Sequence, residues 1–221
     1  MEMAMAKSKL QNKWLMKKYF FLLILTINTS CNAQTSNLMN KENELYHEID
    51  LKRITETNEF VKRGFLSNNN YVELFFNKTG NIVLESSQNS FFSVYKEYYP
   101  NKLIKIKGLQ LNINSRYSFK KGFWYEFDEK GNLIKETDYD IPFKFTFEDI
   151  LKFCKNKRIK IDKGPILQST GWHNKIFRDL ENGHPVWEIE HLKKSDLVEI
   201  IKLDGITGKV LSTSTYKYIN N

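Results

Sequence analysis

Residues 122–139, with the sequence GFWYEFDEKGNLIKETDY, constrain the fold of this chain more than any other stretch. Phe123, Tyr125 and Phe127 occupy alternate positions, which is the period of a half-buried β-strand. The chain then reverses at DEKGN and returns as LIKET. Gly131 lies where a short hairpin loop requires a positive φ, a conformation that costs glycine little. This stretch predicts an antiparallel β-hairpin.

Residues 1–33 predict a secretory signal peptide. Lys17 and Lys18 precede an apolar run over residues 19–27, and small or polar residues follow. The run is too short to cross a bilayer, which needs roughly 20 apolar residues. Met16 begins a complete signal by itself, so we expect it to be the true start.

Two cleavage sites compete at the end of this signal. Thr29-Ser30-Cys31 resembles a bacterial lipobox, although Asn28 stands where that motif prefers an aliphatic residue. Cys31 would then carry a lipid anchor, and acyl chains hold a protein on a membrane at about 0.8 kcal/mol per buried methylene. Alternatively, cleavage before Gln34 would release a soluble secreted protein. We favour the lipoprotein, anchored in the bacterial cell envelope and facing the periplasm or the cell surface.

The charge of the chain does not favour a nucleic-acid partner. The formal net charge is +8, from 34 basic and 26 acidic residues. Residues 1–33 hold five lysines and one glutamate, so the remainder has 29 basic and 25 acidic residues, a net charge of +4. Half of the positive charge therefore belongs to the leader.

The two cysteines do not form a disulfide framework if Cys31 is acylated, because Cys154 then has no partner. We interpret Cys154 as a small buried hydrophobic residue.

Three regions follow the signal. Residues 34–70 are interpreted as a polar tether and a short amphipathic helix, the helix lying within residues 42–57. Residues 71–142 are β-hairpins: FNKTGNIVLE, which contains Gly80, repeats the pattern of FDEKGNLIKE, which contains Gly131. We expect both glycines to form turns.

Residues 98–104 (YYPNKLI) and 121–136 (KGFWYEFDEKGNLIKE) resemble the variant MORN-type repeats of bacterial exported proteins. The resemblance covers about residues 95–139. It departs from the family where Lys102 replaces a glycine after Asn101. It implies stacked β-hairpins and an interaction role, and it carries no catalytic residues.

The third region, residues 143–221, changes character. Thr146 is suited to an N-cap, and Phe147, Ile150, Leu151 and Cys154 follow on one helical face. Strands are then predicted over residues 186–192, 197–203 and 210–218, with the second of these in the centre of a sheet.

This third region resembles a PepSY-type domain over about residues 143–218. The resemblance rests on residues 185–189 (PVWEI) and 198–211 (VEIIKLDGITGKVL). Asp204 can accept hydrogen bonds from turn amides, and Gly208 supplies a positive φ. Domains of this type are non-catalytic inhibitory or binding modules. The predicted class is therefore α+β, with antiparallel β-hairpin repeats followed by a helix and an antiparallel sheet.

No motif predicts enzymatic chemistry. His47-Glu48 begins like a zinc-protease motif, but Leu51 stands where the second histidine is required. His173, His184 and His191 lie close in sequence, but strand alternation sends Glu188 and Glu190 to the face opposite His191. We therefore predict no catalytic residue, no metal and no cofactor.

The candidate partner surface consists of Trp124, Trp172, Lys155, Lys157 and Arg158. The alternatives are core packing for the two tryptophans and a solvated helix end for the three basic residues. The predicted function is a non-enzymatic envelope protein that binds another protein or a peptide. One alternative is an immunity or antitoxin-like protein that neutralises a toxin. Another is an unrecognised hydrolase, which would require a deep pocket in which His173, His184 or His191 converges with carboxylates.

Overall fold

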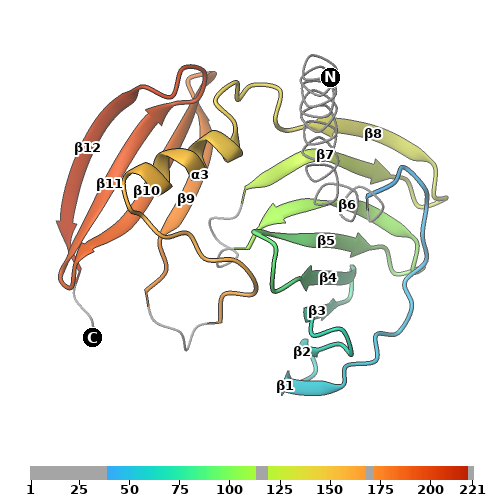
Figure 1. Cartoon of the computed structure of the whole chain (residues 1–221). Helices are drawn as coiled ribbons and strands as arrows, with labels where there is room; N and C mark the ends of the chain where they lie inside the picture. Colours follow the sequence, from blue (N-terminus) through green and yellow to red (C-terminus); the bar gives the residue numbers. More distant parts are fainter. Residues whose placement is uncertain (1–38, 113–118, 168–171, 219–221) are drawn as a thin grey trace, which may run out of the picture. The chain divides into compact units, whose positions relative to one another are not determined.

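The structure, a computed structural model, describes residues 39–112, 119–167 and 172–218 (Figure 1). The chain divides into a unit of residues 1–40 and a unit of residues 41–221, and the features below belong to the second. Its described residues are mostly β, with an eight-stranded and a four-stranded antiparallel sheet and one short helix. The predicted α+β class holds in that coarse form. No helix among the described residues combines the length and hydrophobicity needed to cross a bilayer.

Eight consecutive strands form the first sheet, and each pairs only with its neighbours in sequence. They are β1 (Arg53–Thr57), β2 (Val61–Phe65), β3 (Tyr71–Asn77), β4 (Gly80–Ser86), β5 (Phe92–Tyr98), β6 (Ile104–Leu111), β7 (Lys120–Phe127) and β8 (Leu133–Asp138). The predicted run of hairpins is confirmed, and it extends two strands further toward the N-terminus than expected.

The hairpin predicted over residues 122–139 is present as β7 and β8. Its turn is closed by the Asp128 carboxylate, whose Oδ1 accepts hydrogen bonds from the backbone N–H groups of Lys130 and Asn132, each at 2.9 Å. The Asn132 side chain also donates to this carboxylate, and these donors hold the pKa of Asp128 below its ordinary value. Gly131 has a φ of 84° in the same turn.

Two other turns of this sheet also use positive φ. Gly80 has a φ of 134°, and a Cβ there would lie 1.8 Å from the carbonyl oxygen of Tyr98, so the strands leave no room for a side chain. Lys102, which is not a glycine, has a φ of 69° in the β5–β6 turn. A non-glycine residue in this region carries a backbone cost.

The helix predicted within residues 42–57 is wrong. Residues 41–52, here called the strap, are extended, and β1 follows directly. The strap finds backbone partners in the sheet: Ile104 N–H donates to the Glu44 carbonyl at 2.9 Å. Leu45 is 53 % exposed, so the apolar residues of this segment do not form the buried face of an amphipathic helix.

The helix predicted after Thr146 is confirmed as α3 (Phe147–Asn156). Thr146 forms a capping box with Asp149, in which each side chain accepts a hydrogen bond from the backbone of the other residue. The buried side chains of α3 are Phe147, Ile150 and Cys154.

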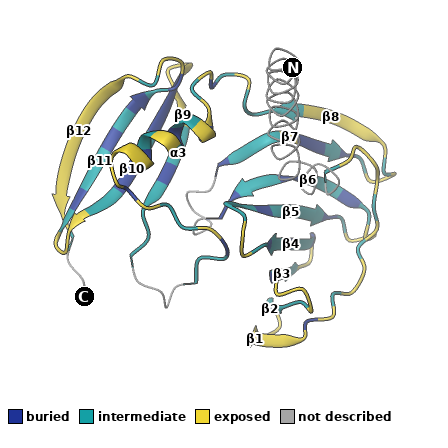
Figure 2. Ribbon diagram, viewed as in Figure 1, coloured by how far each residue is buried: buried dark blue, intermediate teal, exposed yellow. Residues whose placement is uncertain are grey.

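The second sheet has the order β12-β11-β10-β9. Its strands are β9 (Lys175–Glu181), β10 (His184–Lys194), β11 (Leu197–Asp204) and β12 (Val210–Lys217). The prediction of a central strand over residues 197–203 is confirmed, since β11 pairs on both sides. β10 is largely buried, whereas β12 is exposed along its whole length (Figure 2).

One apolar core joins α3 to the second sheet. It also contains Leu111, at the end of β6, and Phe119, just before β7. From α3 and the sheet it includes Phe147, Ile150, Cys154, Ile176, Trp187, Ile189, Ile201 and Leu203.

Candidate functional site

The three histidines of the C-terminal region do not converge. Each pairs with a different carboxylate: His173 with Asp162 at 3.2 Å, His184 with Asp204 at 2.7 Å and His191 with Glu199 at 2.9 Å. Within residues 39–112, 119–167 and 172–218, no group of three or more His, Cys, Asp or Glu side chains could hold a metal ion. The three histidines therefore lie in three separate pairs, and none of them lines the cleft described below.

Trp124 is not a surface residue: of the two roles that the sequence allows, it has the core-packing one and does not belong to a partner surface. It is 3 % exposed, and its indole N–H donates to the Leu109 carbonyl at 3.0 Å. The ring lies across Gly108, where a Cβ would stand 2.1 Å from it. The missing side chain at Gly108 creates the site that buries the indole.

Lys155, Lys157 and Arg158 are exposed at the C-terminal end of α3. Cations are favoured there because the helix dipole places partial negative charge on the last carbonyl groups. This position accounts for the three residues as a solvated helix end.

β12 presents a different kind of surface. The described sheets have four edge strands, β1, β8, β9 and β12, and the first three carry at least two charged side chains each. These charged residues are Arg53 and Glu56 in β1, Lys135, Glu136 and Asp138 in β8, and Lys175, Arg178, Asp179 and Glu181 in β9. β12 has none from Val210 to Tyr216, and all of its residues are exposed. Charges on edge strands prevent pairing with other chains. β12 lacks that protection.

Lysines stand at both ends of this uncharged run. Lys209 precedes it and Lys217 ends it. None of the ion pairs formed by the described residues includes either lysine. β12 is therefore an uncharged, exposed edge with a free cation at each end.

The turn before β12 is rigidly held. Asp204 Oδ1 accepts hydrogen bonds from the N–H groups of Ile206 and Thr207 at 3.0 and 2.7 Å, and Oδ2 lies 2.7 Å from His184 Nε2. The hydrogen bond from the Thr207 N–H is the main reason that the pKa of Asp204 lies well below its ordinary value, and the hydrogen bond with His184 is the second. Gly208 has a φ of 72°. These contacts fix the point at which β12 begins.

Trp172 lies beside the other end of β12. Its half-buried ring packs edge-on against Tyr218, which follows the strand, with 4.8 Å between ring centroids. Lys175 Nζ lies 4.9 Å from the Trp172 ring centroid and 3.1 Å from Glu190. Tyr216 donates a hydrogen bond to Glu190, and burial together with this carboxylate raises the pKa of Tyr216 to about 12. Trp172 thus borders the β12 edge.

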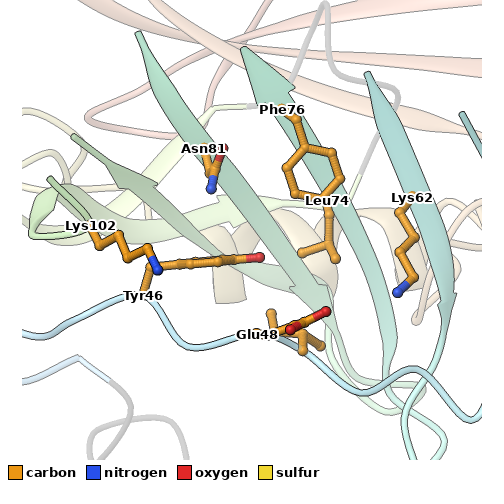
Figure 3. Close-up of a pocket in the computed structure, with 8 residues that line it drawn as sticks. Tyr46, Glu48, Lys62, Leu74, Phe76, Asn81 and Lys102 are labelled. Carbon is orange, nitrogen blue, oxygen red and sulfur yellow. The ribbon is translucent and has the colours of Figure 1, made fainter. Parts of the chain in front are cut away.

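A second site is a cleft of about 210 Å³ between the strap and the first sheet (Figure 3). The Tyr46 N–H donates to the Lys102 carbonyl at 2.8 Å and holds the strap to the β5–β6 turn. The lining residues come from the strap, that turn, β2, β3 and β4, and they are Tyr46, Glu48, Ile49, Lys62, Leu74, Phe76, Asn81 and Lys102. Sequence reasoning found none of them, because they come together only when the strap crosses the sheet.

Next to this cleft, the strap is clamped to the sheet by charge. Lys107 is 1 % exposed, and its Nζ donates to the Glu42 carbonyl at 2.6 Å and to the Glu44 carboxylate at 3.2 Å. Lys96 Nζ lies 2.6 Å from the same carboxylate. Burial lowers the pKa of Lys107, and the negative charge of Glu44 opposes that shift. Glu44 thus ties two lysines of adjacent strands to the strap.

The cysteines offer no reactive site in the described residues. Cys154 is buried in the apolar core that α3 shares with the second sheet. This burial raises the pKa of its thiol to about 12, which disfavours the nucleophilic thiolate. Cys31 lies outside the described residues.

Comparison of the chain with known protein families, with curated proteins and with solved structures finds no match.

Proposed function

We propose that this chain is an exported, lipid-anchored, non-enzymatic protein of the bacterial envelope that binds an extended segment of a partner polypeptide along β12. The observation that carries the proposal is the contrast between β12 and the other three edge strands, which all bear charges. An extended peptide added to an exposed sheet edge gains main-chain hydrogen bonds, and neighbouring side chains supply specificity.

The lysines at the ends of β12 indicate the chemistry of the partner. A symmetric antiparallel pair of β12 strands, centred on Thr213, would place Lys209 opposite Lys217 at both ends. Like charges placed opposite one another destabilise strand pairing. A segment with acidic residues at its ends would pair with both lysines instead. We therefore assign β12 to a partner with acidic flanks and not to a second copy of this chain.

The resemblance of residues 143–218 to PepSY-type domains supports a binding role, because such domains are non-catalytic inhibitory or binding modules. The order of α3 and the strands after it, together with the Asp204 turn, suits that resemblance. The MORN-like hairpins support an interaction role in the same way.

The β12 proposal is tested with a short labelled peptide of alternating valine and threonine, with aspartate at both ends. Fluorescence anisotropy should show saturable binding to the wild-type protein. Thr213→Lys places a charge in the middle of the edge and should abolish that binding. The matched control is Thr55→Lys in β1, an edge that already carries charges, and it should leave binding unchanged.

Two outcomes would contradict this assignment. One is equal peptide binding by the wild type and by Thr213→Lys. The other is concentration-dependent dimerisation of the wild type that Thr213→Lys removes, since it would make a second copy the occupant of the edge.

The anchor is tested by Cys31→Ser. If Cys31 is acylated, the wild type should fractionate with membranes and the variant should move to the soluble fraction, because the acyl chains supply most of the membrane affinity. Cys154→Ser is the matched control and should stay with the membranes. Unchanged fractionation of Cys31→Ser would refute the lipoprotein assignment and favour cleavage before Gln34.

A further inference from the structure

The cleft between the strap and the first sheet is lined by three charged side chains that have no ion-pair partner at close range among the described residues. Lys62, Lys102 and Glu48 all line it, and none of them belongs to an ion pair within 4.0 Å among the described residues. Asp50 interacts electrostatically with Lys62, but its close partner is Lys52 at 2.5 Å.

Lys62 is the most informative of these side chains. It is half-buried on β2, where it pairs across the sheet with Leu74, which is 2 % exposed. A cation beside an apolar surface loses part of its hydration, and this cost is normally offset by a nearby anion. The cleft places no carboxylate within ion-pair distance of Lys62. A bound anion would supply the missing partner.

The positions of the charges define what such a ligand must carry (Figure 3). Lys62 and Lys102 lie at opposite ends of the cleft, and Glu48 lies between them in this view. Each ammonium group suits a carboxylate, and the Glu48 carboxylate suits an ammonium group. The lining thus has two positive charges and one negative charge, which complements a ligand with two carboxylates and one ammonium.

The remaining lining fits the rest of such a molecule. Leu74, Phe76 and Ile49 provide apolar contact for methylene groups, and Asn81 and the Tyr46 hydroxyl provide hydrogen-bonding groups. A volume of about 210 Å³ is below the roughly 300–1,000 Å³ of pockets that hold drug-sized ligands. This size limits the occupant to a molecule comparable to a single amino acid.

We infer that the strap cleft is a binding site for a free acidic amino acid of the glutamate class. Its two carboxylates pair with Lys62 and Lys102, its ammonium pairs with Glu48, and its methylenes lie against the apolar floor. The site is separate from β12 and does not depend on the partner proposed there.

Isothermal titration of the purified full-length chain with three related compounds tests this assignment. Glutamate carries all three charged groups, glutamine lacks the second carboxylate, and N-acetylglutamate lacks the ammonium. Glutamate should bind, and each of the other two should bind about tenfold more weakly, because a hydrogen bond to a charged group contributes about 1.5–3 kcal/mol and 1.4 kcal/mol is a factor of ten.

Variants assign each charge. Lys62→Met should weaken glutamate binding about tenfold, and Lys62→Arg, which keeps the charge, should retain most of it. Glu48→Gln should weaken glutamate binding to a similar extent and should not weaken that of N-acetylglutamate, which has no ammonium to pair with Glu48. Lys78→Met, in the β3–β4 turn outside the cleft, is the matched control and should bind glutamate like the wild type.

Several results would overturn the inference: no saturable binding of glutamate, equal affinity for the three compounds, or unchanged glutamate affinity in a folded Lys62→Met variant. Thr213→Lys should bind glutamate normally, so failure of this site and failure of the β12 proposal are distinguishable.

Discussion

The two sheets differ in what packs against them: a helix with apolar contacts on the second sheet, and an extended segment with polar contacts on the first. The second sheet is covered by α3, whose Ile150 side chain packs with Trp187 and other apolar residues in a common core. The first sheet is covered by the strap, which is held by backbone hydrogen bonds and by the ion pairs of Glu44 with Lys96 and Lys107. An extended segment has no wide apolar face, so charge and backbone pairing replace the apolar contacts that an amphipathic helix provides. We expect the strap to respond to the loss of charge, and α3 to the loss of volume.

The largest expected loss of stability comes from a substitution in the apolar core between α3 and the second sheet. Trp187→Ala should lower the free energy of unfolding by about 3–5 kcal/mol, because the fully buried ring packs against Phe119 and Phe143. Trp124→Ala should cost less, since Lys120 lies over the Trp124 ring and its flexible side chain can close part of the space. Urea denaturation of both variants measures the difference. Equal costs, or a larger cost at Trp124, would show that the first sheet depends on buried aromatic volume as much as the core around α3 does.

An intermediate effect is expected at the clamp. Glu44→Gln should destabilise the protein by about 1–3 kcal/mol, because it leaves the buried Lys107 without its carboxylate. Adding Lys107→Met should restore most of that loss, since an apolar side chain of similar length no longer needs a partner. The double-mutant cycle is measured by urea denaturation. A double variant whose loss equals or exceeds the sum of the single losses would show that charge pairing does not hold the strap.

The smallest effect depends on pH and concerns the turn before β12. The pKa of Asp204 is depressed in the folded protein, so the charged carboxylate contributes stability above the unfolded pKa of about 3.9 and loses it as pH falls through the folded pKa. Asp204→Asn should be less stable than the wild type at neutral pH, and the gap should narrow below about pH 4. Urea midpoints recorded from pH 7 to pH 3 test this (the range brackets the unfolded pKa). A gap that does not depend on pH would mean that the charge of Asp204 does not stabilise its turn.

The parts of the fold that could be predicted from the sequence are those with local causes. The hairpin turn at Gly131 and the capping box of α3 each lie within a few residues, so their signals are visible in one stretch. The strap could not be predicted, because Glu44 pairs with Lys96 and Lys107 more than fifty positions away. Its helical spacing of apolar residues was coincidental.

Strand β9 and the candidate sites were not predicted because their causes also lie outside the local sequence. Arg178 in β9 breaks the alternation of apolar and polar residues, since its side chain is 4 % exposed and stacks on aromatic rings while its guanidinium donates to Asp140 at 2.7 Å. Trp172 beside β12 was identified because a tryptophan is conspicuous in a sequence. The uncharged composition of β12 was equally visible, but its significance depends on the strand being an edge, which only the pairing order shows.

The strap has a consequence for the order in which this protein folds. Every strand of the first sheet pairs with its immediate chain neighbour, so the sheet can form by successive short loop closures, which are entropically cheap. The strap precedes all of these strands in sequence. Lys52 at its end donates to the Phe65 carbonyl of β2, but residues 42–46 make their hydrogen bonds to the β5–β6 turn and to Lys107 of β6. The docking of residues 42–46 must therefore await strands that follow them by more than fifty residues. During synthesis, residues 42–46 of the strap therefore have no partner in the sheet until β6 has formed. The cleft can form only at that late step.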